Sequence, residues 1–375
     1  MIMLSYQFIS QISIIGRTQW NILAQQNLFC QYEWLVALEN SHCASAHTGW
    51  QPHHLAVYQQ DTLIAILPGY IKSHSYGEYV FDWSWAEAYE AHSLTYYPKW
   101  LSGVPFTPIT GKRILTKTLT TELSAYIQHV LQQEMLNKQW SSTHINFLTQ
   151  AEHFNDTMMI RHAVQFHWQN KGFQCFDDFL ATMTARKRKM IKKERSQVAA
   201  TSLNIIWLSG GEITTEHMQG FFSCYQQTYL KRSGHHGYLN WAFFDEIQRT
   251  MQKSIHLCIA YDTETLVAAS LYLSDGDTLY GRYWGSLAEY QHLHFELCYY
   301  RGIDFAIKNQ LLRFDAGAQG EHKLARGFEP KTTYSAHQIA DPMFARAITD
   351  FIARERIHIA QYALQCKAQL PFKNE

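Results

Sequence analysis

Both halves of the chain show the same succession of strand and helix patterns, and this order constrains the fold more than any other feature. Strand patterns in the first half lie at 6–15, 53–59, 62–73 and 142–149, and helical patterns lie at 27–41 and 119–136. In the second half, strand patterns lie at 203–209, 255–262, 265–275, 278–286 and 311–318, and helical patterns at 215–232, 240–252 and 292–309. The alternation predicts an α/β (α+β) fold built from two modules of one plan.

The length of 375 residues also favours two domains. We place the first domain at 1–170 and the second at 171–340. After them, Asp341 is a typical N-cap residue and Pro342 a typical first helical residue, so a helix is expected over 341–375.

A strongly basic run, residues 186–195, stands out because the whole chain has a formal net charge of zero. A pI near 7.3 disfavours a general nucleic-acid-binding protein, so the role of this charge should be local. We expect a single helix here with Phe179, Met183 and Met190 on its apolar side. The cations then form either a solvated face or a phosphate-binding face, and the sequence leaves both open.

The seven cysteines are scattered and form no CxxC pair, which is typical of reduced thiols in a cytoplasmic protein. Residues 1–16 lack a basic leader region, and no stretch approaches the roughly 18 apolar residues of a spanning helix. We therefore expect a soluble cytoplasmic protein without integral membrane association. His294, Glu296 and Cys298 fit no zinc spacing, so no metal is predicted.

Several segments together resemble the FemAB-like proteins, which consist of tandem acyltransferase modules of the GNAT type. The similar segments are 67–89, 96–99, 105–113, 185–198, 281–285, 294–330 and 333–342. The resemblance implies two GNAT-like domains, each with a mixed central sheet flanked by helices, and a C-terminal helix that packs back on the first domain. It also implies transfer of an aminoacyl group from aminoacyl-tRNA to an amine of a cell-wall precursor. Other relatives are described as N-acetyltransferases.

The segment 315–328 is the strongest candidate for the reaction centre. Glycines allow a close approach of the backbone to an anion, and nearby cations can neutralise phosphate or a developing oxyanion. Lys323 with Gly327 and Phe328 resembles a lysine and glycine-phenylalanine pair near the reaction centre of FemAB-like relatives. The candidate catalytic residues are Lys323, Glu321, His322 and Asp315, the last three as possible bases. A surface turn with incidental charges, and a reaction without any protein base, remain open.

Two further groups of residues are candidates for holding substrates. For the donor and its phosphates they are Arg186, Arg188, Lys189, Lys192, Lys193, Gly317, Gly320, Arg326, Gly327, Tyr283 and Trp284. For the acceptor they are Tyr76, Glu78, Tyr79, Asp82 and Trp83, on a strand whose alternation would send both acids to one face. Tyr283 and Trp284 could equally be core aromatics, and the acidic strand could be ordinary.

These observations predict an acyltransferase with no tightly bound cofactor, whose co-substrate is aminoacyl-tRNA or an acyl-CoA thioester. Its acceptor is an amine-bearing small molecule or peptide. The segment from Arg282 lacks the GNAT pyrophosphate signature, because Leu287 replaces a small residue, and this favours the tRNA-borne donor. The alternatives are an acetyl-CoA-dependent N-acetyltransferase and a non-enzymatic peptidoglycan-recognition protein.

Overall fold

The computed structural model describes residues 4–151, 153–154, 157–317 and 320–373 of the chain. Residues 1–3 of the predicted first domain and 374–375 of the predicted C-terminal helix lie outside the described residues. Contacts divide the chain into two units, unit 1 (1–164 and 332–362) and unit 2 (165–331 and 363–375). The predicted domains 1–170 and 171–340 are segments expected to fold independently. The division into units does not test independent folding, so these boundaries stay a prediction.

Unit 1 contains a small antiparallel sheet in the order β1-β3-β4-β7 and part of a larger one in the order β15-β8-β6-β5-β2. The strands of the small sheet are β1 (Leu4–Ile9), β3 (His54–Gln59), β4 (Thr62–Leu67) and β7 (Leu115–Thr116). Those of the larger sheet are β2 (Trp50–Pro52), β5 (Gly69–Lys72), β6 (Lys99–Ser102), β8 (Ser142–Leu148) and β15 (Glu329–Ile339), which continues from unit 2. Pro68 separates β4 from β5, so one apolar run supplies both sheets.

The helices of unit 1 cover both sheets. They are α1 (Arg17–Ala24), α2 (Tyr32–Asn40), α3 (Trp83–Ala91), α4 (Thr121–Asn137) and the larger part of α11 (Pro342–Ala368). Helix α4 begins at the Thr120 cap, whose hydroxyl accepts from the Leu123 amide at 3.2 Å, and its apolar side packs on Trp100 and Ile145. Helix α11 begins where Asp341 accepts from the Met343 amide at 2.8 Å. It packs through Phe344, Ile348 and Ile352 on Trp85 and Tyr89 of α3.

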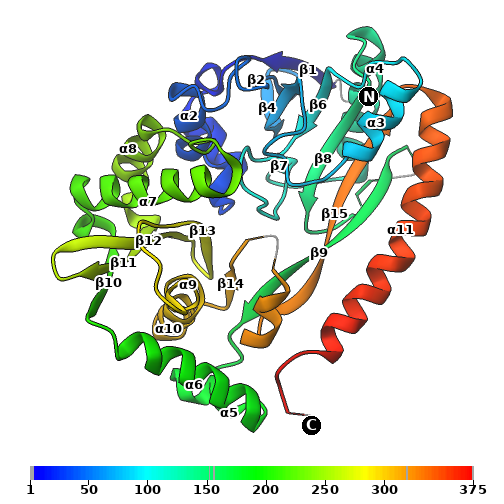
Figure 1. Cartoon of the computed structure of the whole chain (residues 1–375). Helices are drawn as coiled ribbons and strands as arrows, with labels where there is room; N and C mark the ends of the chain where they lie inside the picture. Colours follow the sequence, from blue (N-terminus) through cyan, green and yellow to red (C-terminus); the bar gives the residue numbers. More distant parts are fainter. Residues whose placement is uncertain (1–3, 152, 155–156, 318–319, 374–375) are drawn as a thin grey trace. The chain divides into compact units, whose positions relative to one another are not determined.

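Unit 2 has one mixed sheet segment in the order β10-β11-β12-β13-β14-β9. Its strands are β9 (Met159–Gln169, which begins in unit 1), β10 (Leu203–Ser209), β11 (Ile255–Asp262), β12 (Thr265–Ser274), β13 (Thr278–Ser286) and β14 (Arg313–Asp315). Its helices are α5 (Phe176–Ala181), α6 (Ala185–Ala199), α7 (Thr215–Ser233), α8 (Trp241–Thr250), α9 (Leu293–Phe295), the π-helix η5 (Glu296–Tyr300), α10 (Arg301–Lys308) and the 3₁₀ helix η6 (Glu321–Arg326). In Figure 1, α7 lies along β12 and β13, and α9 and α10 lie on the other face of these strands.

The predicted α/β class is confirmed, and the hairpin at 255–275 and the strand 278–286 lie where the sequence places them. The four remaining helical turns are η1 (Ile12–Ile14), η2 (Leu28–Cys30), η3 (Gly210–Glu212) and η4 (Gln252–Ser254). The predicted strand at 311–318 is shorter, because β14 ends at Asp315.

The expectation of one helix carrying Phe179, Met183 and Met190 is wrong. The chain forms two helices, α5 and α6, separated by residues 182–184. The break is fixed from outside the helices, since the Thr184 amide donates to the Pro371 carbonyl at 2.9 Å. The buried side of α6 is instead formed by Ile191, Glu194 and Val198.

Candidate active site

In unit 2, the whole of the short strand β14 pairs with the beginning of β13. Their parallel ladder joins Thr278–Tyr280 to Arg313–Asp315. Strand β13 then continues to Ser286, paired with β12 on its other side, whereas β14 ends. The two strands therefore separate after Tyr280, and we call this separation the fork.

A buried ion pair lies where the fork opens. Arg282 of β13 donates to both carboxylate oxygens of Asp315, at 2.7 Å from Nη2 to Oδ2 and 3.2 Å from Nη1 to Oδ1. The Gly317 amide also donates to Oδ1, at 2.8 Å. Burial alone raises the pKa of Asp315, but Arg282 and His167 hold it well below its usual value. Asp315 is therefore an ionised carboxylate that ties the two strands together.

Lys323 lies beside this ion pair in the turn η6. It is 2% exposed, and its ammonium donates to the carbonyls of Ala316 at 2.8 Å and Gly317 at 2.7 Å. Burial lowers the pKa of Lys323 to about 8, while Asp315 acts in the opposite direction. Gly317 has a φ of 84°, and a Cβ built on it would meet no atom of the described residues within 4 Å. The cationic side chain thus fixes the backbone segment that carries Gly317.

The basic run and this turn are joined by an ion pair. Glu194, the single acid of the run, accepts from Arg326 at 2.8 Å on each of its oxygens. Arg326 also donates to the His322 carbonyl at 2.8 Å and stacks 3.4 Å above the centre of the Phe295 ring. The structure therefore brings α6 and η6 together, and the guanidinium of Arg326 is engaged in this contact.

The predicted phosphate-binding cations occupy the outer side of α6. Arg186, Lys189, Lys192 and Lys193 are exposed, and Arg188 is half-buried. Lys192 forms an ion pair with Asp177 of α5 at 3.0 Å. Because both side chains are exposed, this pair contributes little to stability. The outer face of α6 thus carries a concentration of positive charge that solvent can reach.

Of the predicted aromatic residues near the donor, Tyr283 and Trp284 differ in their surroundings. Tyr283 is buried and packs on Tyr225 of α7, with ring centres 5.6 Å apart. Trp284 is half-buried, and its ring centre lies 5.3 Å from that of His294 in α9. Since the His294 ring also contacts His322 of η6, Trp284 belongs to the group of rings beside η6.

The ring of His322 in η6 lies among three residues that were not assigned to the site from the sequence: His294, Phe295 and Tyr299. They surround His322 of η6, whose Nε2 is 2.7 Å from the Tyr299 hydroxyl oxygen. His322 itself is exposed, as is the neighbouring Glu321. The density of histidine and aromatic residues at 292–300 is the signal that could have identified them.

The predicted acceptor residues lie in unit 1, but not on a strand. Glu78 belongs to the loop between β5 and α3, and Asp82 is the N-cap residue of α3. Tyr79 has a φ of 59°, which an extended strand excludes. Tyr76 is 55% exposed, and its ring packs on that of Trp83 with ring centres 5.1 Å apart. The predicted strand is therefore wrong, and the two acids share one environment through a loop and a helix cap.

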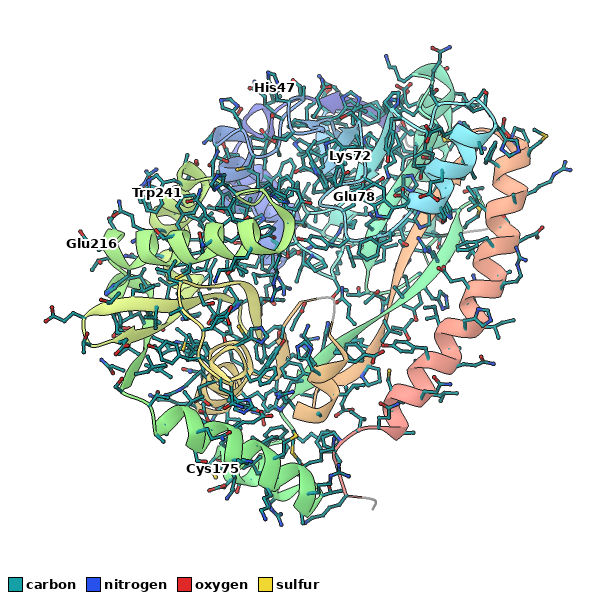
Figure 2. The ribbon with its side chains drawn as sticks, in the orientation of Figure 1. His47, Lys72, Glu78, Cys175, Glu216 and Trp241 are labelled. Atoms are coloured by element: carbon teal, nitrogen blue, oxygen red, sulfur yellow. The ribbon has the colours of Figure 1, made fainter. Side chains whose placement is uncertain are left out.

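That environment is a buried charge cluster, made of Lys72, Lys99, Glu78 and Asp82. The two lysines face each other in the β5–β6 ladder, and neither side chain is exposed. Lys99 donates to Glu78 Oε2 at 2.9 Å and to Asp82 Oδ2. The Lys72 ammonium lies 3.9 Å from Glu78 Oε1, and Figure 2 labels Lys72 and Glu78 in unit 1. Burial raises the pKa of Glu78 to about 7 and lowers that of Lys72 to about 7. Glu78 Oε1 and Asp82 Oδ1 accept no hydrogen bond from the described residues.

Among the described residues, no group of three or more metal-ligating side chains gathers at one place. Within the same residues, no helix is long and apolar enough to cross a membrane.

The sequence profile of one protein family, described as FemAB-like and as peptidoglycan biosynthesis/recognition, matches residues 11–374. The chain belongs to the FemAB-like family. This membership makes it an acyltransferase, as the resemblance of its segments predicted. No curated protein matches the FemAB-like chain.

The fold is similar to that of FemX, a solved structure. FemX aligns with a TM-score of 0.50 at 10% identity, over 85% of this FemAB-like chain and 94% of FemX. A tandem GNAT protein from the clavulanic acid biosynthesis pathway aligns with a TM-score of 0.45 at 9% identity, over 91% of this chain and 99% of its own. L-PGS from Bacillus licheniformis aligns with a TM-score of 0.48 at 10% identity, over 85% of this chain and 95% of its own.

Proposed function

We propose that this FemAB-like protein forms an amide between an aminoacyl group carried by tRNA and an amine of a cell-wall-precursor-like acceptor. The observation that carries the proposal is the fork with its buried Arg282–Asp315 pair and the adjacent Lys323. Beyond Tyr280 the side of β13 toward β14 is no longer covered by that strand, and a strand edge suits an extended acyl donor.

In this proposal the residues of unit 2 have distinct roles. Arg282 and Lys323 supply positive potential where negative charge develops on the carbonyl oxygen of the donor. Gly317, Gly320 and Gly327, all at positive φ, let the backbone approach the donor closely. The exposed cations of α6 attract the tRNA phosphates.

The acceptor side is proposed to lie at the loop of unit 1 that carries Tyr76, Glu78 and Tyr79, together with Asp82 and Trp83 of α3. The exposed Tyr76 and Trp83 rings offer a contact surface. Glu78 and Asp82 are held by Lys99 and their remaining oxygens are also buried, so these two acids shape the surface from beneath it.

Replacing Lys323 by alanine is expected to lower transfer of a radiolabelled aminoacyl group about 100-fold, because a preorganised charge at the developing oxyanion is lost. The assay measures label passing from a charged tRNA pool to an amine-bearing muropeptide. The control is Lys171→Ala, an exposed lysine of the same unit that pairs with Glu329. Equal activity of both variants, with unchanged thermal unfolding, would rule out this role.

Neutralising Arg186, Lys189 and Lys193 to glutamine is expected to reduce the slope of log affinity for tRNA against log salt by about 2–3, because each phosphate contact releases counterions. Filter binding at several salt concentrations measures the slope. The matched control replaces Lys253 and Lys308, which are exposed cations elsewhere in unit 2. A wild-type protein that binds a CoA thioester and shows no salt-dependent tRNA binding would favour the N-acetyltransferase alternative.

A further inference from the structure

Amide formation requires a group that removes a proton from the acceptor amine. Three candidates lie around η6: Asp315, Glu321 and His322. Asp315 is unsuitable, because protonating it would leave the buried guanidinium of Arg282 without its counter-ion. The remaining candidates for the base are two neighbouring exposed side chains, Glu321 and His322.

His322 is held in a defined orientation and is still accessible. Its Nε2 is 2.7 Å from the hydroxyl of Tyr299, a residue that is 4% exposed. The Tyr299 ring is fixed in turn by Phe328, at 5.5 Å between ring centres. Because Nε2 is occupied by this hydrogen bond, Nδ1 is the nitrogen that remains for a substrate.

The π-helix η5 is what places Tyr299 there. Its wide turn is stabilised by partners outside the helix: the Leu297 carbonyl accepts from Ser270 Oγ at 3.0 Å and from the Tyr272 hydroxyl. Glu296 is held by Arg195 of α6 at 3.1 Å and by Arg301 at 3.0 Å. Single π turns inside helices often occur at functional sites, where they reorient one side chain.

The charges facing His322 keep its imidazole neutral. Burial, Lys323 and Arg326 all lower the pKa of His322. The other groups around it are His294 of α9, at 6.1 Å between ring centres, Phe295, the Tyr299 hydroxyl and the adjacent Glu321. A neutral imidazole is the form that can accept a proton.

We propose that His322, oriented by donation from its Nε2–H to the Tyr299 hydroxyl, is the base that deprotonates the acceptor amine, with Tyr299 as its positioning residue. This inference rests on the proposed acyl transfer. The acceptor ammonium gives one proton to Nδ1, and its nitrogen forms a bond to the acyl carbon. The bond from that carbon to the donor oxygen or sulfur breaks, and this leaving atom takes the second proton from the nitrogen. His322 then returns its proton to solvent.

The test compares two acceptors at neutral pH, with alanyl-tRNA or acetyl-CoA as the donor probe. The lysine amide carries an acetylated α-amine, so its one amine is an ε-ammonium that needs a base, whereas hydroxylamine is already largely unprotonated. His322→Gln is expected to lose about 100-fold or more in kcat/KM with lysine amide, within the usual contribution of a general base, and far less with hydroxylamine. Tyr299→Phe should lose about 10-fold and shift the acid limb of the pH–rate profile, because the imidazole loses its orienting partner.

His236→Gln, an exposed histidine of the same unit, is the control and should behave as wild type. Glu321→Gln should also keep most activity. Equal losses of His322→Gln with both acceptors, or a larger loss in Glu321→Gln, would overturn the assignment while leaving the proposed function intact. If the wild-type enzyme acylates neither acceptor from either donor, the proposed function fails and the inference with it.

A measurement on the substrate-free protein tests the positioning separately. The pH dependence of carbethoxylation at His322, followed by peptide mass spectrometry, should change in Tyr299→Phe and not in His236→Gln. An unchanged profile in Tyr299→Phe would show that the hydrogen bond does not control the imidazole.

Discussion

Replacing Lys99 by methionine should lower the free energy of unfolding of unit 1 by about 3–5 kcal/mol, the usual cost of breaking a buried ion pair from one side. Lys99 is fully buried and donates to Glu78, to Asp82 and to Ser75 Oγ at 2.8 Å. Methionine keeps the length of the side chain but leaves two carboxylates without this donor. Urea unfolding, with hydrogen exchange of the β5 and β6 amides as the local probe, measures the loss.

The loss should be smaller near pH 5 than near pH 8, and the sign follows from the carboxyl groups. In the wild type, burial raises the pKa of Asp82, but Lys99 together with His144 and Ser75 holds it well below its usual value, so the stabilisation from this carboxylate is present above the unfolded pKa. Without Lys99, burial raises both carboxyl pKa values, and the variant loses stability as pH rises through them.

Lys117→Met is the matched control, because Lys117 is an exposed lysine of the same unit. It should change the free energy of unfolding by no more than about 0.5 kcal/mol at either pH. A Lys99→Met protein as stable as this control, or one whose loss of stability did not depend on pH, would contradict the prediction. The charges of Glu78 and Asp82 would then not depend on Lys99 for compensation.

The elements of the fold could be predicted where the local pattern alone determines them. Strand β13 and the β11–β12 hairpin follow from short apolar and aromatic runs between turn residues, and α4 and α11 from their caps at Thr120 and Asp341. The break between α5 and α6 could not be predicted, because it depends on Pro371, far away in the sequence. The π-helix η5 likewise depends on Ser270 and Tyr272 rather than on its own spacing.

Part of the candidate site could be proposed from the sequence, but the partners of its residues could not. The chain around Asp315 and Lys323 carries its own signal in glycines and charges. That Arg326 is bound to Glu194, and that Asp82 shares Lys99 with Glu78, is decided by contacts across long sequence separations. Lys72 and Lys99 were not selected from the sequence, because only the register of β5 and β6 places them opposite each other.

Replacing Gly285 by alanine should destabilise unit 2 by about 3 kcal/mol or more, at the upper end of what overpacking costs. Gly285 lies on β13, on the arm of the fork that continues past Tyr280. A Cβ at this position would lie 1.9 Å from the Cys224 carbonyl oxygen and 2.6 Å from the Tyr225 amide nitrogen of α7. Both atoms belong to the backbone, so no side-chain rotation can relieve the clash, and α7 must move away from β13. Thermal unfolding and hydrogen exchange in α7 and β13 measure the effect.

Gly276→Ala provides the control, since a Cβ there meets nothing within 4 Å and the backbone is not in the left-handed region. Its stability should stay within about 0.5 kcal/mol of wild type. If the fork binds the acyl donor, Gly285→Ala should also weaken donor binding at temperatures where the protein remains folded, because β13 shifts relative to Arg282 and Asp315. A stable Gly285→Ala protein with unchanged exchange in α7 would show that the close approach of helix and strand does not fix the geometry of the fork.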